Sequence, residues 1–135
     1  MMNAIHFTTE PPDDFNELVK IYEELGWNSL QLTVIDLEKM CKQSWYAVYA
    51  YENYRLVGMG RVISDGVITA IICGLCVLLS YQSRGIGMEL MNRIITHCEG
   101  HRVIPQLLCV EDLESYYEEL GFKRFSIGMT KQISR

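Results

Sequence analysis

SYQSRGIGMELM, the stretch from Ser80 to Met91, places an arginine and two glycines between an apolar run and a helical pattern. Glycines at such a junction let the backbone turn tightly and present its N–H groups. A helix that begins directly after them directs the positive end of its dipole to the same point. The stretch therefore predicts a site for an anion, such as a phosphate.

The segments on either side of this loop predict a strand and a helix. The apolar run VITAIICGLCVLL, Val67 to Leu79, is typical of a buried strand. It is too long to be straight, so we expect a bulge or kink near Gly74. After the loop, apolar residues recur at helical spacing; they are Ile86, Leu90, Met91, Ile94, Ile95 and Cys98.

The rest of the chain predicts an α+β fold in which helices flank a mixed, mostly antiparallel sheet. The length of 135 residues fits a single domain over positions 1–135. The expected order is strand 4–9, helix 13–25, helix 34–43, strand 44–52, strand 55–63, strand 67–79, helix 86–98, strand 105–109, helix 112–120 and strand 123–133.

Composition limits the classes of function. The net charge of −5 argues against a nucleic-acid partner, which usually meets a basic face. No apolar run reaches the roughly 20 residues of a membrane-spanning helix, and the N-terminus lacks the pattern of a signal peptide. We therefore expect a cytoplasmic protein with no membrane partner.

The cysteines raise the question of a metal site. Cys73-x2-Cys76 and His97-x3-His101 together resemble a zinc-finger pattern, although the 20 residues between the pairs exceed the usual spacing of roughly 12–15. Residues three apart on a regular strand point to opposite faces, so the two thiols should diverge. We predict that the chain holds no metal and that these cysteines pack in the core.

The loop fits neither of two common nucleotide-binding motifs. Leu90 stands where G-x-G-x-x-G requires its third glycine after Gly85 and Gly87, and no G-x-x-x-x-G-K-[ST] occurs. A different nucleotide held by the same loop, or a plain tight turn, is the alternative interpretation of this stretch.

Gln82-Ser-Arg-Gly-Ile-Gly87 resembles the Q/R-x-x-G-x-G/A motif of the GNAT acyl-CoA N-acyltransferases. The upstream hairpin RLVGMGRVISDG and the downstream segment SYYEELGFKRF follow the order of that family. The resemblance spans about Trp45 to Phe125 and implies the GNAT fold, acetyl-CoA as co-substrate and N-acetyltransferase activity on a primary amine of a small molecule.

The resemblance also implies roles for particular residues. Backbone N–H groups of the loop would hold the CoA pyrophosphate, and the pantetheine arm would pair with the preceding strand, which would splay from its neighbour. Tyr117 would protonate the leaving thiolate, although a core tyrosine is the alternative. The cofactor-binding residues would be Leu75, Cys76, Val77, Gln82, Ser83, Arg84, Gly85, Ile86, Gly87 and Met88.

The acceptor side is less defined by the sequence. The loop from Trp27 to Leu32 would form a wall of the acceptor pocket, with Trp27 binding substrate or packing in the core. The amine would attack the thioester directly in a ternary complex, with the Val77 N–H stabilising the oxyanion. The general base stays open among Asp65, Glu111 and Asp112.

Departures from the family pattern leave a second function open. Relatives with this kind of hairpin often carry an acidic residue where Gly74 stands, and that residue can serve as base. Its absence makes a non-catalytic acyl-CoA-binding sensor or regulatory module the alternative. The last expected strand, KRFSIGMTKQI, could pair with a second copy of the chain in a homodimer.

Overall fold

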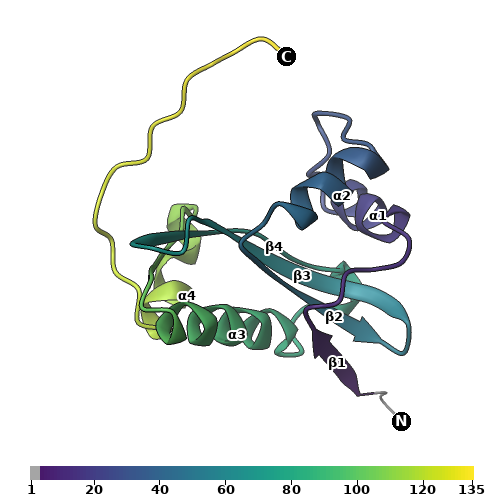
Figure 1. The fold of residues 1–135 in the computed structure, drawn as a ribbon, viewed down its shortest axis with the longest axis horizontal. Helices are drawn as coiled ribbons and strands as arrows, with labels where there is room; N and C mark the ends of the chain where they lie inside the picture. Colours follow the sequence, from purple (N-terminus) through teal and green to yellow (C-terminus); the bar gives the residue numbers. More distant parts are fainter. Residues whose placement is uncertain (1–3) are drawn as a thin grey trace.

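A five-stranded sheet forms the centre of the computed structural model, which describes residues 4–135 (Figure 1). The first four strands pair antiparallel in sequence order, and the fifth pairs parallel to the fourth. The sheet is therefore mixed and mostly antiparallel, as predicted. The strands are β1 (Ile5–Thr8), β2 (Tyr46–Glu52), β3 (Arg55–Ser64), β4 (Thr69–Val77) and β5 (Ile104–Gln106).

Helices cover both faces of this sheet. Figure 1 shows α1 (Asn16–Glu24) and α2 (Val34–Lys42) over one face and α3 (Ile86–Gly100) along the other. A short helix, α4 (Glu114–Glu119), follows β5. The described residues contain no helix long and apolar enough to cross a membrane.

The boundaries of α1 and α2 follow from capping residues. The Asp36 carboxylate accepts a hydrogen bond from the Thr33 backbone N–H at 2.8 Å, and the Thr33 hydroxyl accepts one from the Asp36 N–H at 3.3 Å. This capping box starts α2 at the predicted place. Gly26, with a φ of +73°, adopts the left-handed conformation that ends α1.

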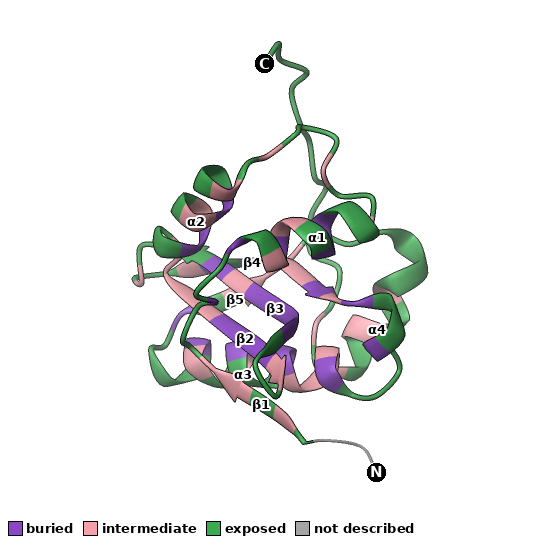
Figure 2. Ribbon diagram, turned by 90° about the vertical axis from the view of Figure 1, so that its right-hand side faces the viewer, coloured by how far each residue is buried: buried purple, intermediate pink, exposed green. Residues whose placement is uncertain are grey.

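The core lies on both sides of the central strands. Figure 2 shows buried segments concentrated along β2 and β3, with further buried residues on the inner sides of the helices. Apolar periodicity predicted the packed face of α3 correctly, because most of the residues at helical spacing are buried. Fully buried members are Leu18, Leu37, Val48, Val57, Met59, Leu90, Met91 and Ile94.

A bulge interrupts β4 at Gly74, as predicted. Arg61 of β3 pairs with Cys73, while Met59, two residues earlier, pairs with Cys76, so β4 holds one extra residue. Gly74 has a φ of +64°, which favours glycine.

The bulge corrects one argument from the sequence. Cys73 and Cys76 pair with two residues of β3 that are two positions apart and therefore lie on one face of the sheet. The two cysteines thus share a face instead of pointing to opposite faces. No group of three or more metal-ligating side chains occurs within residues 4–135.

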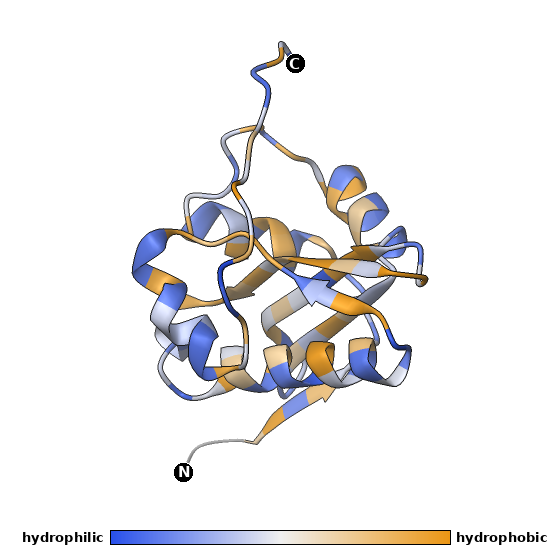
Figure 3. Cartoon of the chain, turned by 90° about the vertical axis from the view of Figure 1, so that its left-hand side faces the viewer, coloured by the Kyte–Doolittle hydropathy of each residue, from blue (hydrophilic) through white to orange (hydrophobic). Residues whose placement is uncertain are grey.

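The predicted strand over 123–133 is wrong. Residues 122–135 form no helix or strand, and Figures 1 and 3 show the chain leaving the sheet there, with hydrophobic and hydrophilic residues along it. Phe125, Ile127 and Met129 are 66%, 86% and 94% exposed. A strand pattern is stable only when a neighbouring strand pairs with it, and no such pairing is present in the described chain.

Two glycines of β3 give a matched test of this packing. A Cβ at Gly58 would lie 2.9 Å from the backbone oxygen of Cys76, whereas a Cβ at Gly60 would meet the mobile ends of Leu75 and Ile94 at 2.9 Å. Backbone atoms cannot move aside as the end of a side chain can. Gly58→Ala should therefore lower the free energy of unfolding by about 2–3 kcal/mol, and Gly60→Ala should lower it by about 1 kcal/mol or less. Urea denaturation measures both, and the reverse order would contradict this packing.

Candidate functional site

The open edge of β4 is the feature around which the candidate site is built. β5 pairs with β4 only through Thr69, Ala70 and Ile71, and it ends at Gln106. β4 continues to Val77, so its residues from 72 onward have no partner strand on that side among residues 4–135. Such an edge offers N–H and C=O groups to an extended ligand. The pairing of the two strands therefore ends well before the loop.

The edge leads directly to the loop that precedes α3. Gly85 is the N-cap of α3 with a φ of +85°, no side chain caps this end, and a Cβ added there would meet nothing within 4 Å. The N–H groups at the start of a helix have no partner within the helix. The amides of Ile86, Gly87 and Met88 therefore have no partner within the helix, which suits them to an anion.

Hydrogen bonds hold this loop against the sheet. The Tyr81 ring is buried, and its hydroxyl donates to the Glu52 carboxylate of β2 at 2.6 Å. The Gln82 side-chain amide donates to the Val77 carbonyl at 2.9 Å. The Leu79 N–H donates to the Glu24 carboxylate at 3.3 Å. These contacts fix the end of β4 relative to the start of α3.

Arg84 supplies positive charge at the loop. Its guanidinium carbon lies 4.9 Å from the centre of the Tyr81 ring, and the residue is exposed. Stacking on an aromatic ring orients the guanidinium while its N–H donors stay available. The preceding Ser83 has a φ of +64°, so the chain turns sharply on both sides of Arg84. The loop is thus locally positive on a chain with a net charge of −5.

The predicted residues on β4 differ in their surroundings. Leu75 faces α3, because its Cδ1 lies 2.9 Å from the Cβ position of Gly60. Cys76 is buried on the other face, and burial raises the pKa of its thiol to about 12. A thiol with this pKa is protonated at neutral pH and is a poor nucleophile. Packing therefore explains Cys76 better than covalent catalysis does.

Tyr117 lies on α4, half-buried against the core. Its ring makes edge contacts with Tyr116 and Phe122, with centroid separations of 5.1 and 6.1 Å. Burial raises the pKa of Tyr117, so the phenol is neutral at physiological pH and can donate a proton.

The acceptor side contains two residues that the sequence analysis missed. The Trp27 ring is 43% exposed and meets the Tyr22 ring edge-on at 5.5 Å. The Tyr22 hydroxyl and the Arg61 Nε would lie 3.4 and 3.3 Å from a Cβ at Gly74. A line of side chains thus connects the predicted acceptor loop with the bulge of β4. The only signal for Arg61 was a charge within an otherwise buried strand pattern.

The carboxylates proposed as general base have other surroundings. Asp65 accepts a hydrogen bond from the Val67 N–H at 2.9 Å, in the turn at the opposite end of β4 from the loop. Glu111 and Asp112 are exposed in the short 3-10 helix before α4. Within residues 4–135 these contacts connect none of the three with Gly74.

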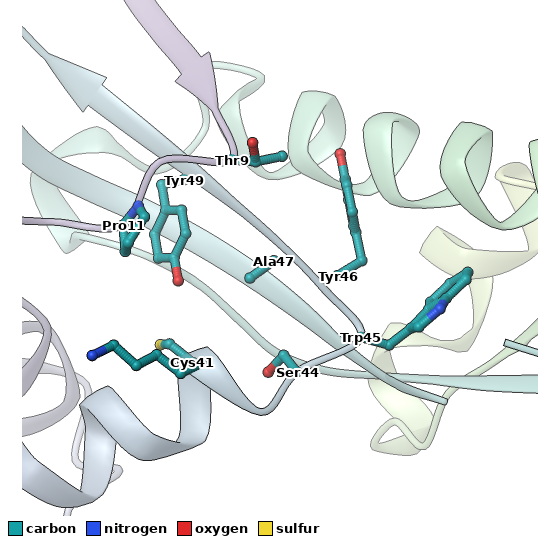
Figure 4. Close-up of a pocket in the computed structure, with 9 residues that line it drawn as sticks. Thr9, Pro11, Cys41, Ser44, Trp45, Tyr46, Ala47 and Tyr49 are labelled. Carbon is teal, nitrogen blue, oxygen red and sulfur yellow. The ribbon is translucent and has the colours of Figure 1, made fainter. Parts of the chain in front are cut away.

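A separate pocket of about 270 Å³ lies between α2 and β2 (Figure 4). Its lining includes Thr9, Cys41, Trp45, Tyr46 and Tyr49. The sheet order places β2 two strands away from β4, and none of the predicted site residues lines this pocket. The candidate site is therefore the open edge and loop.

Comparisons with known proteins point to one family. The model of the acetyltransferase (GNAT) domain matches residues 33–131. GCN5-related N-acetyltransferase 3, chloroplastic, of Arabidopsis thaliana is 38% identical over 79 residues, which are 58% of this chain and 33% of that protein. The chain thus spans about a third of the length of this curated relative.

Solved structures agree with this assignment. A Staphylococcus aureus protein of unknown function, described as a probable acetyltransferase, is 26% identical with a TM-score of 0.83, over 96% of this chain and 100% of that one. A Deinococcus radiodurans R1 protein named as an acetyltransferase is 28% identical with a TM-score of 0.82, over 98% and 94%.

Two left-handed glycines provide a test of the loop as an anion site. Gly85→Glu should weaken CoA binding about 100-fold, because it adds a carboxylate where the pyrophosphate would lie. Gly121→Glu is the matched control: Gly121 also has a positive φ, of +96°, and a Cβ there meets nothing within 4 Å. Titration calorimetry measures both affinities. Equal losses in the two variants would show that backbone strain, and not charge at the loop, weakens binding.

Proposed function

The chain belongs to the GNAT acetyltransferase family, and from this membership we propose that it transfers the acetyl group of acetyl-CoA to the primary amine of a small molecule. The observation that carries the proposal is the continuous path from the open edge of β4 to the uncapped start of α3. An extended arm fits the edge, and a pyrophosphate fits the helix start.

The residues present fit acetyl-CoA, which supplies an activated thioester when bound. Amides from Gln82 to Met88 would hold its pyrophosphate, with Arg84 adding charge. The unpartnered edge of β4 from Leu75 to Val77 would pair with the pantetheine arm. The open space at Gly85 supports this arrangement, because a ligand atom can approach the backbone there.

The hydrogen bonds at the end of β4 support an oxyanion role for Val77. The Leu78 N–H donates to the Val57 carbonyl of β3 at 2.9 Å. Backbone groups alternate in direction along a strand, so the Val77 amide points to the open edge. The Val77 carbonyl, which receives the Gln82 side chain, points there as well. The Val77 N–H can therefore donate to charge that develops on the thioester oxygen.

The transfer would be direct, within a ternary complex. The protonated Cys76 thiol does not favour an acetylated cysteine, so the neutral amine would attack the thioester carbon. Tyr117 would then give its phenolic proton to the departing thiolate. Positioning of the two substrates would supply much of the rate enhancement.

One observation favours a second candidate, an acyl-CoA-binding sensor or regulatory module. Within residues 4–135, Arg61 and Tyr22 surround Gly74 where relatives often have a carboxylate. Release of free thiol from acetyl-CoA, measured with a panel of primary amines, separates the two functions. Turnover of any amine supports the transferase, and CoA binding without turnover of the panel supports the sensor.

The partners and compartment are also proposals. All five cysteines are free, which fits a reducing compartment such as the cytoplasm. The exposed apolar residues of the C-terminal segment, residues 123–133, would pair with a second copy of the chain in a homodimer.

Tyr117→Phe tests the general acid. The substitution removes only the hydroxyl, so kcat should fall about 100-fold while the KM for acetyl-CoA changes little. Tyr116→Phe is the matched control on the adjacent, equally half-buried position. Steady-state kinetics measure both variants. A kcat for Tyr117→Phe equal to that of the wild type would assign Tyr117 to the core alone.

The homodimer is tested by the apolar residues of the C-terminal segment. The wild type should dimerise, whereas the double variant Phe125→Ser, Ile127→Ser should be monomeric. Each serine has less apolar surface to bury in the dimer contact than the exposed side chain it replaces. Sedimentation over a range of concentrations measures the association. The pair Thr130→Ser, Gln132→Ser in the same segment is the control. A dimer that survives the first double variant would exclude this segment as the interface.

A further inference from the structure

Arg61 is a half-buried cation in the middle of β3. Its Nε atom is buried and has no hydrogen-bond partner, the one such side-chain nitrogen or oxygen within residues 4–135. A buried polar nitrogen without a partner costs free energy, and a charged group costs more. The fold therefore keeps an unfavourable group at this position.

Arg61 is placed at the acceptor side of the proposed site. Its side chain crosses the bulge, with Nε 3.3 Å and Cγ 3.4 Å from the Cβ position of Gly74. The Tyr22 hydroxyl lies 3.4 Å from the same point, and Tyr22 contacts Trp27. The next residue on β4 is Leu75, where the edge proposed for the thioester begins.

Arg61 forms no ion pair within residues 4–135. The groups whose pKa its charge lowers include Tyr22, Tyr49, Cys41 and Cys73. Burial raises the pKa of each, and Arg61 only partly opposes this, so all four are neutral at pH 7. The ion pairs of the described chain lie elsewhere: Lys42–Glu38, Arg93–Glu89 and Arg124–Glu114.

An oxyanion would give the guanidinium the anionic partner that it lacks within residues 4–135. The planar guanidinium presents several N–H donors in a geometry that matches carboxylate and phosphate. A ligand that lies over the bulge could bring such a group to Arg61 while its amine reaches the edge near Val77. Strand residues rise by about 3.3 Å each, so Gly74 and Val77 are separated by roughly 10 Å at most. An amine and an oxyanion on one small molecule can span part of this distance.

We propose that Arg61 binds an oxyanion of the acceptor, so that the substrate class is amines that also carry a carboxylate or phosphate. The inference rests on the proposed transferase function. Arg61 is then a specificity-determining residue, and Tyr22 lies beside it as a neutral hydrogen-bonding group. An uncharged or cationic amine would leave the guanidinium without an anionic partner.

Matched acceptors test the proposal on the full chain. Glycine, β-alanine and 4-aminobutyrate are compared with methylamine, ethylamine and propylamine, and O-phosphoethanolamine with ethanolamine. The wild type should prefer at least one oxyanion-bearing acceptor by about 100-fold in kcat/KM. Comparison of the carboxylate acceptors with the phosphate acceptor identifies which oxyanion the site binds. The chain-length series identifies the distance between amine and oxyanion that the site accepts. Equal rates for all matched pairs would overturn the proposal.

Variants of Arg61 connect the preference to this residue. Arg61→Gln should lower kcat/KM about 100-fold for the preferred acceptor, mainly through KM, and leave its neutral counterpart nearly unchanged. Arg61→Lys should restore part of the preference, because lysine returns the positive charge but not the planar set of N–H donors of the guanidinium. Arg93→Gln, on the surface of α3, is the control. Equal losses with both kinds of acceptor would overturn a specificity role.

Stability and binding give a readout that does not require turnover. Arg61→Gln should keep or raise the melting temperature, because an unpaired buried charge is removed. The preferred acceptor should raise the melting temperature of the wild type but not of Arg61→Gln. If amines are turned over without regard to charge, the proposal is overturned and the transferase stands. If no amine is turned over yet this thermal shift occurs, Arg61 is an oxyanion site and the transferase function fails.

Discussion

The early end of the pairing between β4 and β5 is the constraint on which the candidate site depends. Pairing covers only Thr69 to Ile71 of β4, because β5 ends at Gln106. A longer β5 would satisfy the backbone of Leu75 to Val77 and close the edge. The short strand leaves these groups to a ligand, so a local limit on hydrogen bonding creates the opening.

The opening is useful because the next elements are fixed relative to it. Gln82 binds the last carbonyl of β4, and Tyr81 binds Glu52 on β2. The start of α3 therefore keeps its place at the end of the open edge. An acidic chain can hold an anion there because amides and the helix dipole act over a short range. Local geometry, and not net charge, determines the ligand.

The amino-acid sequence predicted the elements whose signals are local. Thr33 with Asp36, Gly26, and the glycines of the loop each specify a backbone conformation regardless of distant contacts. The strand predicted over 123–133 failed because a strand requires a partner, and alternation alone does not supply one. Tyr22 and Arg61 were missed because they meet only after α1 packs against β3. Their separation in sequence leaves no local signal for this contact.

Gly74 and Arg61 are best understood as a coupled pair. The φ of +64° favours glycine at position 74, and the absence of a side chain leaves room for Arg61 and the Tyr22 hydroxyl. A carboxylate at this position would neutralise the guanidinium and occupy the same space. A site cannot offer both a free carboxylate and a free guanidinium at one bulge. This chain has the guanidinium. Under the proposed transfer, the bulge would attract negative charge, and the acceptor amine would lose its proton to water or to a group farther from the bulge.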